Sequence, residues 1–476
     1  MTRRVFILGG GPCGLALAYD LSRQEIPVTL IEADTQLGGL AKSISWGASK
    51  MDLGPHKLFT LDHDLWKKVQ QMLPEGQWIE HPKISQIFLH QNYLAYPPTP
   101  VDLWKTFGLL ASMACARDLA GAQLRFGRAE KPEKSIPTFA SDAQRRVGKR
   151  LYNLFFKPLA SKIWGDPETL DEGLSKSRIQ VPSVSGVIAG LFKSKSGKDW
   201  QAHQYHYPRG GLCTLWDVMA RKIREKGGEI ILGDPLVSIE TRAEDQIARL
   251  QTRGGRHWDV QAGSDWVIST IPLSRTAKLL KKSPPDRVLE QIGKLQLNDL
   301  FLVFLKVKED VLGKNAWVFV PDPKVIFHRL SGQRKFDPGM VEEGLHLLCC
   351  EVMSYPGKEA ATLSDSQLVE RCVDGLVEMR CLKERTSVVD SLIIRLPKSY
   401  PVMTAGYRAV LNETLAYFDR FKNLRTIGRQ GAYNYIGSLD AMDTGFGMAK
   451  LLIDNRVSSP DWSVERQRTA YYPILD

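Results

Sequence analysis

The stretch Val5-Phe6-Ile7-Leu8-Gly9-Gly10-Gly11-Pro12-Cys13-Gly14 decides the fold of this 476-residue chain. It opens with an apolar run of strand length, and apolar residues at helical spacing follow from Leu15 to Leu21. The glycines fall between the two: Gly9 permits a tight turn, Gly11 lets the backbone approach a pyrophosphate, and Gly14 lets the helix pack on the strand. Phosphate oxygens would then meet the positive N-terminus of a helix. This order of strand, turn and helix predicts a dinucleotide-binding unit.

A second apolar run, Val28 to Ile31, ends in Glu32, which lies 18 residues after Gly14. In a βαβ unit an acid at this place reaches the two ribose hydroxyls of an adenosine. The agreement of strand, helix and acid favours dinucleotide binding over a glycine-rich turn in an ordinary α/β unit. Arg3-Arg4 and the apolar run after them imitate a secretory signal, but the glycines, Asp20 and the missing small-residue cleavage site argue against one.

The residues after Glu32 bear on which dinucleotide is bound. Gly38-Gly39-Leu40 follows the acid, and Lys42-Ser43 comes next. Bare backbone at the glycine pair can lie against a ribityl chain or a flavin edge, while Lys42 can face a phosphate. This extension resembles that of the glutathione-reductase-type FAD fold, in particular the group of amine oxidases, protoporphyrinogen oxidases and UDP-galactopyranose mutases. The resemblance implies FAD as the cofactor, with contacts from Gly9, Gly11, Pro12, Cys13, Gly14, Glu32, Gly38, Gly39 and Leu40.

The composition is that of a large folded enzyme. With 43% hydrophobic and 25% charged residues, the chain can bury one large core or two ordinary ones. The charge-free apolar stretches Thr106 to Ala116 and Ile179 to Phe192 are shorter than the ~20 residues of a membrane span, so we expect no transmembrane segment. Seven scattered cysteines form neither a CxxC pair nor a disulfide framework, which predicts a reducing cytosol and cytoplasmic localisation. We interpret Cys349 and Cys350 as packing residues on opposite sides of a strand.

The net charge of +11 suggests an anionic partner, and part of the excess lies between Arg117 and Arg150. No zinc-ligand spacing, RNP-like aromatic residues or helix-turn-helix signature accompanies it, so we expect neither nucleic acid nor a metal ion. A solvated basic face is one interpretation. A peripheral contact with a membrane surface or an acidic partner is the other, and the sequence predicts no oligomeric state.

Further patterns suggest that the chain leaves the nucleotide fold and returns to it. We predict a β-hairpin from Ile84 to His90 and Tyr93 to Tyr96, turning at Gln91-Asn92, and helices over residues 101–119 and 142–157. Apolar runs at residues 300–307, 316–320 and 345–352 predict a mostly antiparallel sheet below a substrate cavity. Strands are also expected at residues 229–232 and 236–240 and within residues 265–272.

These elements predict an α/β protein, α+β over the whole chain. We expect a discontinuous glutathione-reductase-type FAD-binding Rossmann domain at residues 1–79, 203–275 and 409–476. An inserted substrate-binding domain of mixed helices and antiparallel sheet would occupy residues 80–202 and 276–408. Val237, on a strand that returns beside the adenine in FAD enzymes of this type, is our candidate for a backbone contact.

Two internal motifs resemble the mutase branch of this group. Gly54-Pro55-His56 resembles its Gly-Pro-His loop, which implies that His56 faces the isoalloxazine; the alternative is an ordinary loop histidine. The run Lys162-Ile163-Trp164-Gly165-Asp166-Pro167 is similar to a second motif of that branch. Trp164 could then stack on a planar or sugar ring, with Lys162 or Arg178 neutralising an anionic group. The alternative is that Trp164 belongs to the core.

The carboxyl-terminal motif runs from Gly428 to Tyr435, followed by residues 439–448. The resemblance implies that Arg429 lies near the isoalloxazine. It also implies a helix start near Asp443 to Gly445, whose amides stabilise negative charge on the flavin. Asn434 stands where the mutases carry Arg, and the segment between Tyr435 and Asp443 is longer, so the reaction stays open. The remaining candidates are His56, Tyr435 and Arg429 for catalysis, Asp443, Gly445 and Phe446 for the cofactor, and Trp164, Arg178 and Tyr407 for a small-molecule substrate.

The leading hypothesis is an FAD-dependent oxidoreductase that takes hydride from a small or medium organic substrate onto flavin N5, as in protoporphyrinogen oxidases and amine oxidases. The second is a non-redox nucleotide-sugar isomerase of the UDP-galactopyranose mutase type, which uses reduced FAD. The third is an escort protein that carries FAD without catalysis.

Overall fold

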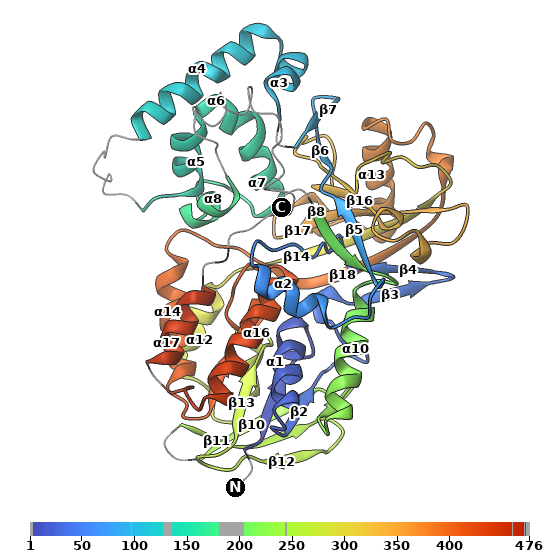
Figure 1. Cartoon of the computed structure of the whole chain (residues 1–476). Helices are drawn as coiled ribbons and strands as arrows, with labels where there is room; N and C mark the ends of the chain where they lie inside the picture. Colours follow the sequence, from blue (N-terminus) through green and yellow to red (C-terminus); the bar gives the residue numbers. More distant parts are fainter. Residues whose placement is uncertain are drawn as a thin grey trace.

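The computed structural model describes residues 3–96, 98–126, 136–179, 204–242, 245–458, 460–470 and 472. The fold is mixed α/β with parallel and antiparallel sheets, as predicted. In Figure 1 a parallel sheet and its helices form the lower part of the molecule, while an antiparallel sheet and a group of helices form the upper part. The two parts meet around the carboxyl ends of the parallel strands.

The parallel sheet has the strand order β19-β13-β1-β2-β9. Its inner strands β1 and β2 are buried on both faces, which explains why the sequence shows continuous apolar runs here. On β1 (Val5–Leu8), Val5 and Ile7 pack into a core with the helices, whereas Phe6 and Leu8 pack against the small β10-β11-β12 sheet on the other face. The other four strands are β2 (Val28–Ile31), β9 (Glu229–Ile231), β13 (Trp266–Ser269) and β19 (Leu424–Thr426).

The second large sheet has seven strands in the order β18-β14-β17-β16-β15-β6-β7. All its pairs are antiparallel except β15 with β6, so the prediction of a mostly antiparallel sheet is confirmed. Cys349 and Cys350 are buried in different cores on its two faces, as predicted. The strands are β6 (Ser85–Leu89), β7 (Asn92–Ala95), β14 (Leu297–Val307), β15 (Trp317–Phe319), β16 (Arg329–Gly332), β17 (His346–Ser354) and β18 (Val388–Pro401).

The predicted hairpin is present, but its turn lies one residue earlier, at His90 and Gln91, which both have positive φ. A two-residue hairpin turn of type I′ requires this conformation at both positions. The predicted helix over residues 101–119 is broken by Gly108, at φ +81°, into α3 (Pro100–Phe107) and α4 (Leu109–Phe126). Gly148 likewise separates α5 (Phe139–Val147) from α6 (Lys149–Leu151).

The parallel sheet draws strands from all three segments assigned to the nucleotide-binding domain, but the domain division itself stays a prediction. In the described part of the chain, no helix is both long and apolar enough to cross a membrane. The remaining elements are α1 (Pro12–Arg23), β3 (Ser43–Trp46), β4 (Ser49–Asp52), α2 (His63–Gln70), β5 (Trp78–Pro82), α7 (Lys157–Ile163), α8 (Glu172–Arg178), β8 (Gln204–Pro208), α10 (Leu212–Glu225), β10 (Leu236–Arg242), β11 (Gln246–Thr252), β12 (His257–Asp259), α11 (Leu273–Leu279), α12 (Asp286–Lys294), α13 (Asp365–Glu378), α14 (Tyr407–Asp419), α15 (Gly428–Gly431), α16 (Ser438–Ile453) and α17 (Asp461–Thr469).

Candidate active site

A cavity of about 580 Å³ lies where the carboxyl ends of β1 and β2 face the seven-stranded sheet. It brings together segments from both ends of the chain and from the middle. Ten of the predicted site residues line it: Gly9, Gly11, Pro12, Cys13, Glu32, Gly39, Leu40, His56, Arg429 and Tyr435.

The amino-terminal wall of this cavity has the shape that a dinucleotide needs. Gly11 caps helix α1, and a Cβ added to it would meet only the Cα of Gly39, at 4.0 Å, so its backbone faces open space. The first turn of α1 contains no acidic residue, which leaves its positive end available to phosphate. Gly14 has a different role, since its Cβ would lie 2.0 Å from the carbonyl oxygen of Gly9 and prevent the close packing of helix on strand.

Glu32 is held rigidly at the edge of the same wall. Its Oε2 accepts from the amide of Gly10 at 2.6 Å and its Oε1 from the amide of Asp34 at 2.9 Å. Each carboxylate oxygen keeps a second acceptor site, so the side chain is positioned to accept from ribose hydroxyls as well. Lys42 forms an ion pair with Asp34 at this edge. These residues fit an adenosine diphosphate group.

The carboxyl-terminal wall corrects one prediction. Helix α16 begins at Ser438, not near Asp443, and its first residues line the cavity. Its start is fixed by Asp440, whose carboxylate accepts from the amide of Gly437 at 3.1 Å. The amides that face the cavity therefore belong to this earlier turn.

The three residues predicted at that helix start lie within α16 and have structural contacts. Asp443 accepts from Arg468 and from the hydroxyl of Tyr472. A Cβ on Gly445 would lie 2.3 Å from the carbonyl oxygen of Cys13, so this glycine allows α16 to pack closely on α1. The ring of Phe446 lies 3.8 Å from the ammonium of Lys68.

The far side of the cavity is polar and aromatic. Arg329 on β16 lies directly opposite Glu351 on β17 and donates from Nη2 to its carboxylate at 2.7 Å. The rings of Tyr400 and Tyr435 lie 5.3 Å apart. The guanidinium of Arg429 stands 4.6 Å from the Tyr435 ring and donates to the carbonyl of Ile436 at 2.6 Å. Burial raises the pKa of Tyr400, so its hydroxyl is a hydrogen-bond donor at neutral pH.

His56 lies in the cavity wall with its Nε2 3.1 Å from the carbonyl oxygens of both Leu40 and Leu53. Two acceptors at one nitrogen require that this nitrogen carry the proton. Burial, together with the positive charge of Arg329, lowers the pKa of His56 to about 4, although its bonds to the backbone oppose this shift. The imidazole is thus neutral at pH 7 and joins two segments of the cavity wall. Its catalytic role stays a prediction.

Two of the three substrate candidates, Trp164 and Tyr407, lie outside this cavity lining. Trp164 is buried behind Tyr435, with its ring edge-on at 6.2 Å, so it supports a cavity residue. Tyr407 is buried in another core against Tyr433, and this position does not support a ligand contact. The side chain of Arg178 lies outside the described residues. Val237 on β10 is 40% exposed and does not line the cavity, so its adenine contact stays a prediction.

The sequence reasoning missed the pair of Arg329 and Glu351. A signal was present, because Glu351 is a single charge within the apolar run from Leu347 to Met353, and a buried charge requires a partner. The partner lies 22 residues away on another strand, and the sequence does not show it.

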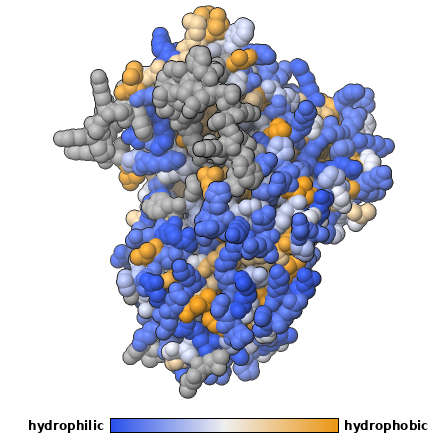
Figure 2. Space-filling view, viewed as in Figure 1, coloured by the Kyte–Doolittle hydropathy of each residue, from blue (hydrophilic) through white to orange (hydrophobic). Residues whose placement is uncertain are grey.

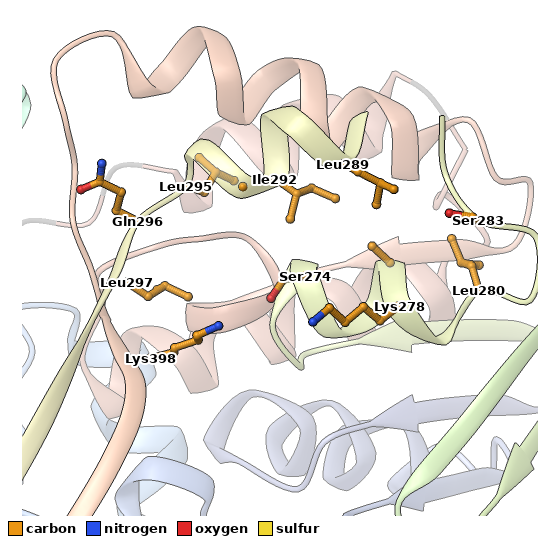
Figure 3. A pocket seen from close by; sticks show the side chains of 12 residues that line it. Ser274, Lys278, Leu280, Ser283, Leu289, Ile292, Leu295, Gln296, Leu297 and Lys398 are labelled. Carbon is orange, nitrogen blue, oxygen red and sulfur yellow. The ribbon is translucent and has the colours of Figure 1, made fainter. Parts of the chain in front are cut away.

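A second cavity, of about 720 Å³, lies between α11 and α12 near the start of β14 (Figure 3). Lys278 and Lys398 extend toward its centre, and its upper wall carries Leu289 and Ile292 (Figure 3). Among the described residues, its lining contains one glycine, Gly293, and none of the predicted site residues. Only Lys398 lines both cavities.

Residues 12–426 match the sequence family of flavin containing amine oxidoreductases. The chain belongs to this family. Among its curated relatives, mitochondrial protoporphyrinogen oxidase of Nicotiana tabacum is 23% identical over 496 residues, covering 95% of each chain. A probable UDP-galactopyranose mutase of Klebsiella pneumoniae is 28% identical over 186 residues, which are 37% of this chain and 44% of the relative.

Solved structures show the same fold. A crystal structure of reduced UDP-galactopyranose mutase superposes with a TM-score of 0.82 at 19% identity, covering 98% of this chain and 97% of the other. A putative protoporphyrinogen oxidase from Exiguobacterium superposes with a TM-score of 0.71 at 18% identity, covering 95% and 99%. The family implies a flavin cofactor. Among the described residues, no group of three or more His, Cys, Asp or Glu could hold a metal ion.

Proposed function

We propose that this protein binds FAD and oxidises a small or medium organic substrate in the polar part of the first cavity. One observation carries the proposal: a single cavity joins the glycine-lined wall and Glu32 to Arg329, Tyr400, Arg429 and Tyr435. An FAD molecule with its adenosine diphosphate against the glycine-lined wall and Glu32 would bring its isoalloxazine ring to the arginines and tyrosines at the far side of the cavity.

The cofactor would be held at one end by backbone and the Glu32 side chain, and at the other by the first amides of α16. The open backbone at Gly11 and the start of α1 would hold the pyrophosphate, and Glu32 the ribose. The first amides of α16, at Ser438 to Asp440, would face the flavin and favour negative charge on it. Bound FAD supplies a two-electron acceptor that takes hydride from a substrate.

The side chains on the far side of the cavity would orient the substrate and would favour substrates of a particular charge. The aromatic faces of Tyr400 and Tyr435 offer a surface for a planar group, and the buried Tyr400 hydroxyl can donate a hydrogen bond. Glu351 pairs with Arg329, whereas Arg429 donates to a carbonyl group and has no acidic partner among the described residues. This arrangement favours a neutral or anionic substrate over an ammonium group.

The test is a flavin spectrum of the purified chain, followed by anaerobic addition of amines, porphyrinogens, polyenes and nucleotide sugars. We expect one of these classes to bleach the flavin band. If the protein binds FAD but no class of compound bleaches the flavin band, the oxidoreductase hypothesis is contradicted and the escort-protein hypothesis is favoured. A colourless protein that binds no added FAD would overturn the cofactor as well.

A nucleotide-sugar isomerase is the second candidate. It is favoured by Arg429, which lies beside two tyrosines and has no ion-pair partner among the described residues, because a nucleoside diphosphate carries negative charge. This alternative predicts turnover of a nucleotide sugar only after dithionite reduction of the flavin, with no net consumption of electrons. Bleaching of the oxidised flavin by substrate would exclude it.

A further inference from the structure

Helices α3 and α4 expose an apolar surface at the end of the molecule opposite the parallel sheet (Figure 1). Leu110 is 81% exposed, Leu124 77% and Trp104 54%. Hydrophobic surface is visible along this upper edge in Figure 2. We call this surface the α3–α4 face and define it by Val101, Trp104, Leu109, Leu110, Met113 and Leu124.

The pattern along α4 shows that the exposure is systematic. Leu109, Met113 and Leu124 follow one another at helical spacing on the outer side, while Cys115 and Ala122 on the other side are buried. The helix is therefore apolar on both sides, and the protein covers only one of them. Contiguous exposed apolar surface of this kind marks an interaction site in water-exposed proteins.

Charged residues beside the face indicate its partner. Lys105 and Arg117 are exposed on the same two helices, and within the described residues no ion pair engages either of them. Lys149 is exposed on the neighbouring helix α6, beside Arg150, which pairs with Asp118 at 3.5 Å, and the chain as a whole carries +11. A helix pair with Leu and Met outward, a Trp at its edge and Lys and Arg beside it has the composition of an interfacial membrane helix.

We propose that the α3–α4 face docks onto a bilayer surface that carries anionic lipid headgroups. The apolar side chains enter the headgroup boundary, and the basic side chains contact the headgroups. The convex position of the two helices at an outer edge of the molecule allows this contact without any movement of the sheets (Figure 1). The proposal does not depend on which reaction the cavity performs.

Co-sedimentation of the full chain with vesicles tests it. We expect binding to vesicles of three parts phosphatidylcholine to one part phosphatidylglycerol, with at least tenfold weaker binding to phosphatidylcholine alone or in 1 M salt. The double variant L110E/M113E should bind the anionic vesicles with a partition coefficient at least tenfold lower than that of the unmodified chain. The double variant K105E/R117E should lose binding to the anionic vesicles in particular.

The matched control is V464E on α17, where an equally exposed apolar residue lies far from the face. It should bind like the unmodified chain, and circular dichroism should show that every variant is folded. The proposal would be overturned if L110E/M113E bound the anionic vesicles as well as the unmodified chain does, or if the unmodified chain did not bind them. Self-association that L110E/M113E abolishes, without vesicle binding, would also overturn it and assign the face to a second copy of the chain.

Discussion

At the scale of single residues, Glu32 should control how tightly the chain holds FAD. The variant E32Q keeps an oxygen for the amide of Gly10 but removes the negative charge that would face the ribose. We expect FAD affinity to fall about tenfold, the equivalent of ~1.4 kcal/mol. Titration of the apoprotein with FAD, followed by fluorescence, measures the change. The exposed Glu225 is the matched control, and an E225Q variant that weakens FAD equally would contradict the assignment.

Asp52 makes a prediction about pH. Its carboxyl is buried and accepts from Ser43, Tyr207 and the amide of Leu212, yet burial raises its pKa to about 6. The folded chain thus binds this proton more tightly than the unfolded chain, whose Asp pKa is near 3.8. Its contribution to stability is complete below about pH 4 and is lost as the pH rises through 6.

The variant D52N has no carboxyl group at this position, so the stability of the folded chain should no longer fall as the pH rises through 6 on account of residue 52. Between pH 4 and pH 7 the free energy of unfolding of the unmodified chain should fall relative to that of D52N by about 2 kcal/mol, since one pKa unit corresponds to ~1.4 kcal/mol and part of the full difference is already lost at pH 4. Denaturant unfolding at the two pH values checks it. Parallel pH profiles for both proteins would show that folding does not raise the pKa of Asp52.

Residues within short local patterns were predictable. The glycines, Glu32, His56, Arg429 and Tyr435 all line one cavity, because each sits at the end of a strand or in a motif that fixes its place. Residues whose contacts depend on distant strands were not: Arg329 and Glu351 were missed, and Tyr407 was expected at the ligand although it is buried elsewhere.

At the scale of elements, the contact between α1 and α16 depends on Gly445. In G445A the added methyl group would lie 2.3 Å from the carbonyl oxygen of Cys13, so the helices must move apart. We expect a loss of about 1–3 kcal/mol in the free energy of unfolding, as for other overpacked sites. In G293A on α12 nothing lies within 4 Å of the new methyl group, and this control should gain up to ~1 kcal/mol from helix propensity. Equal effects of the two variants would contradict the packing argument.

The strands β16 and β17 make a second prediction, through their ion pair. Removing one partner leaves a buried charge, so E351Q should cost about 3–5 kcal/mol in unfolding free energy. The double variant R329M/E351L should cost clearly less than the two single changes together. The exposed pair of Glu290 and Lys294 is the control, where E290Q should change stability by about 0.5 kcal/mol or less. Additive costs at positions 329 and 351 would show that the pair is not coupled.

The sequence predicted the strands better than the helix ends. β1, β2 and β13 fall where apolar runs stand, because both faces of this sheet are buried. Helix starts depend on single capping residues, and Asp440 was overlooked in favour of the later Asp443. Gly108 interrupts an apolar pattern that continues on both sides, so periodicity alone could not locate the break.

At the scale of the whole molecule, the cavity draws its walls from both large sheets, so ligand binding and stability should be linked. FAD at one hundred times its dissociation constant should add about 2.7 kcal/mol to the free energy of unfolding. Denaturant titration of apoprotein with and without FAD measures this, and E32Q should gain less at the same FAD concentration. An unchanged midpoint would mean that FAD does not bind the folded chain preferentially.

The pairing of α1 with α16 has a consequence for synthesis in the cell. The two helix starts that form the cavity wall, at Pro12 and Ser438, are separated by almost the entire chain. A ribosome must therefore translate nearly all of the message before the nascent polypeptide can complete its flavin pocket. Products of premature stop codons upstream of α16 should emerge colourless, even though they contain the whole glycine motif.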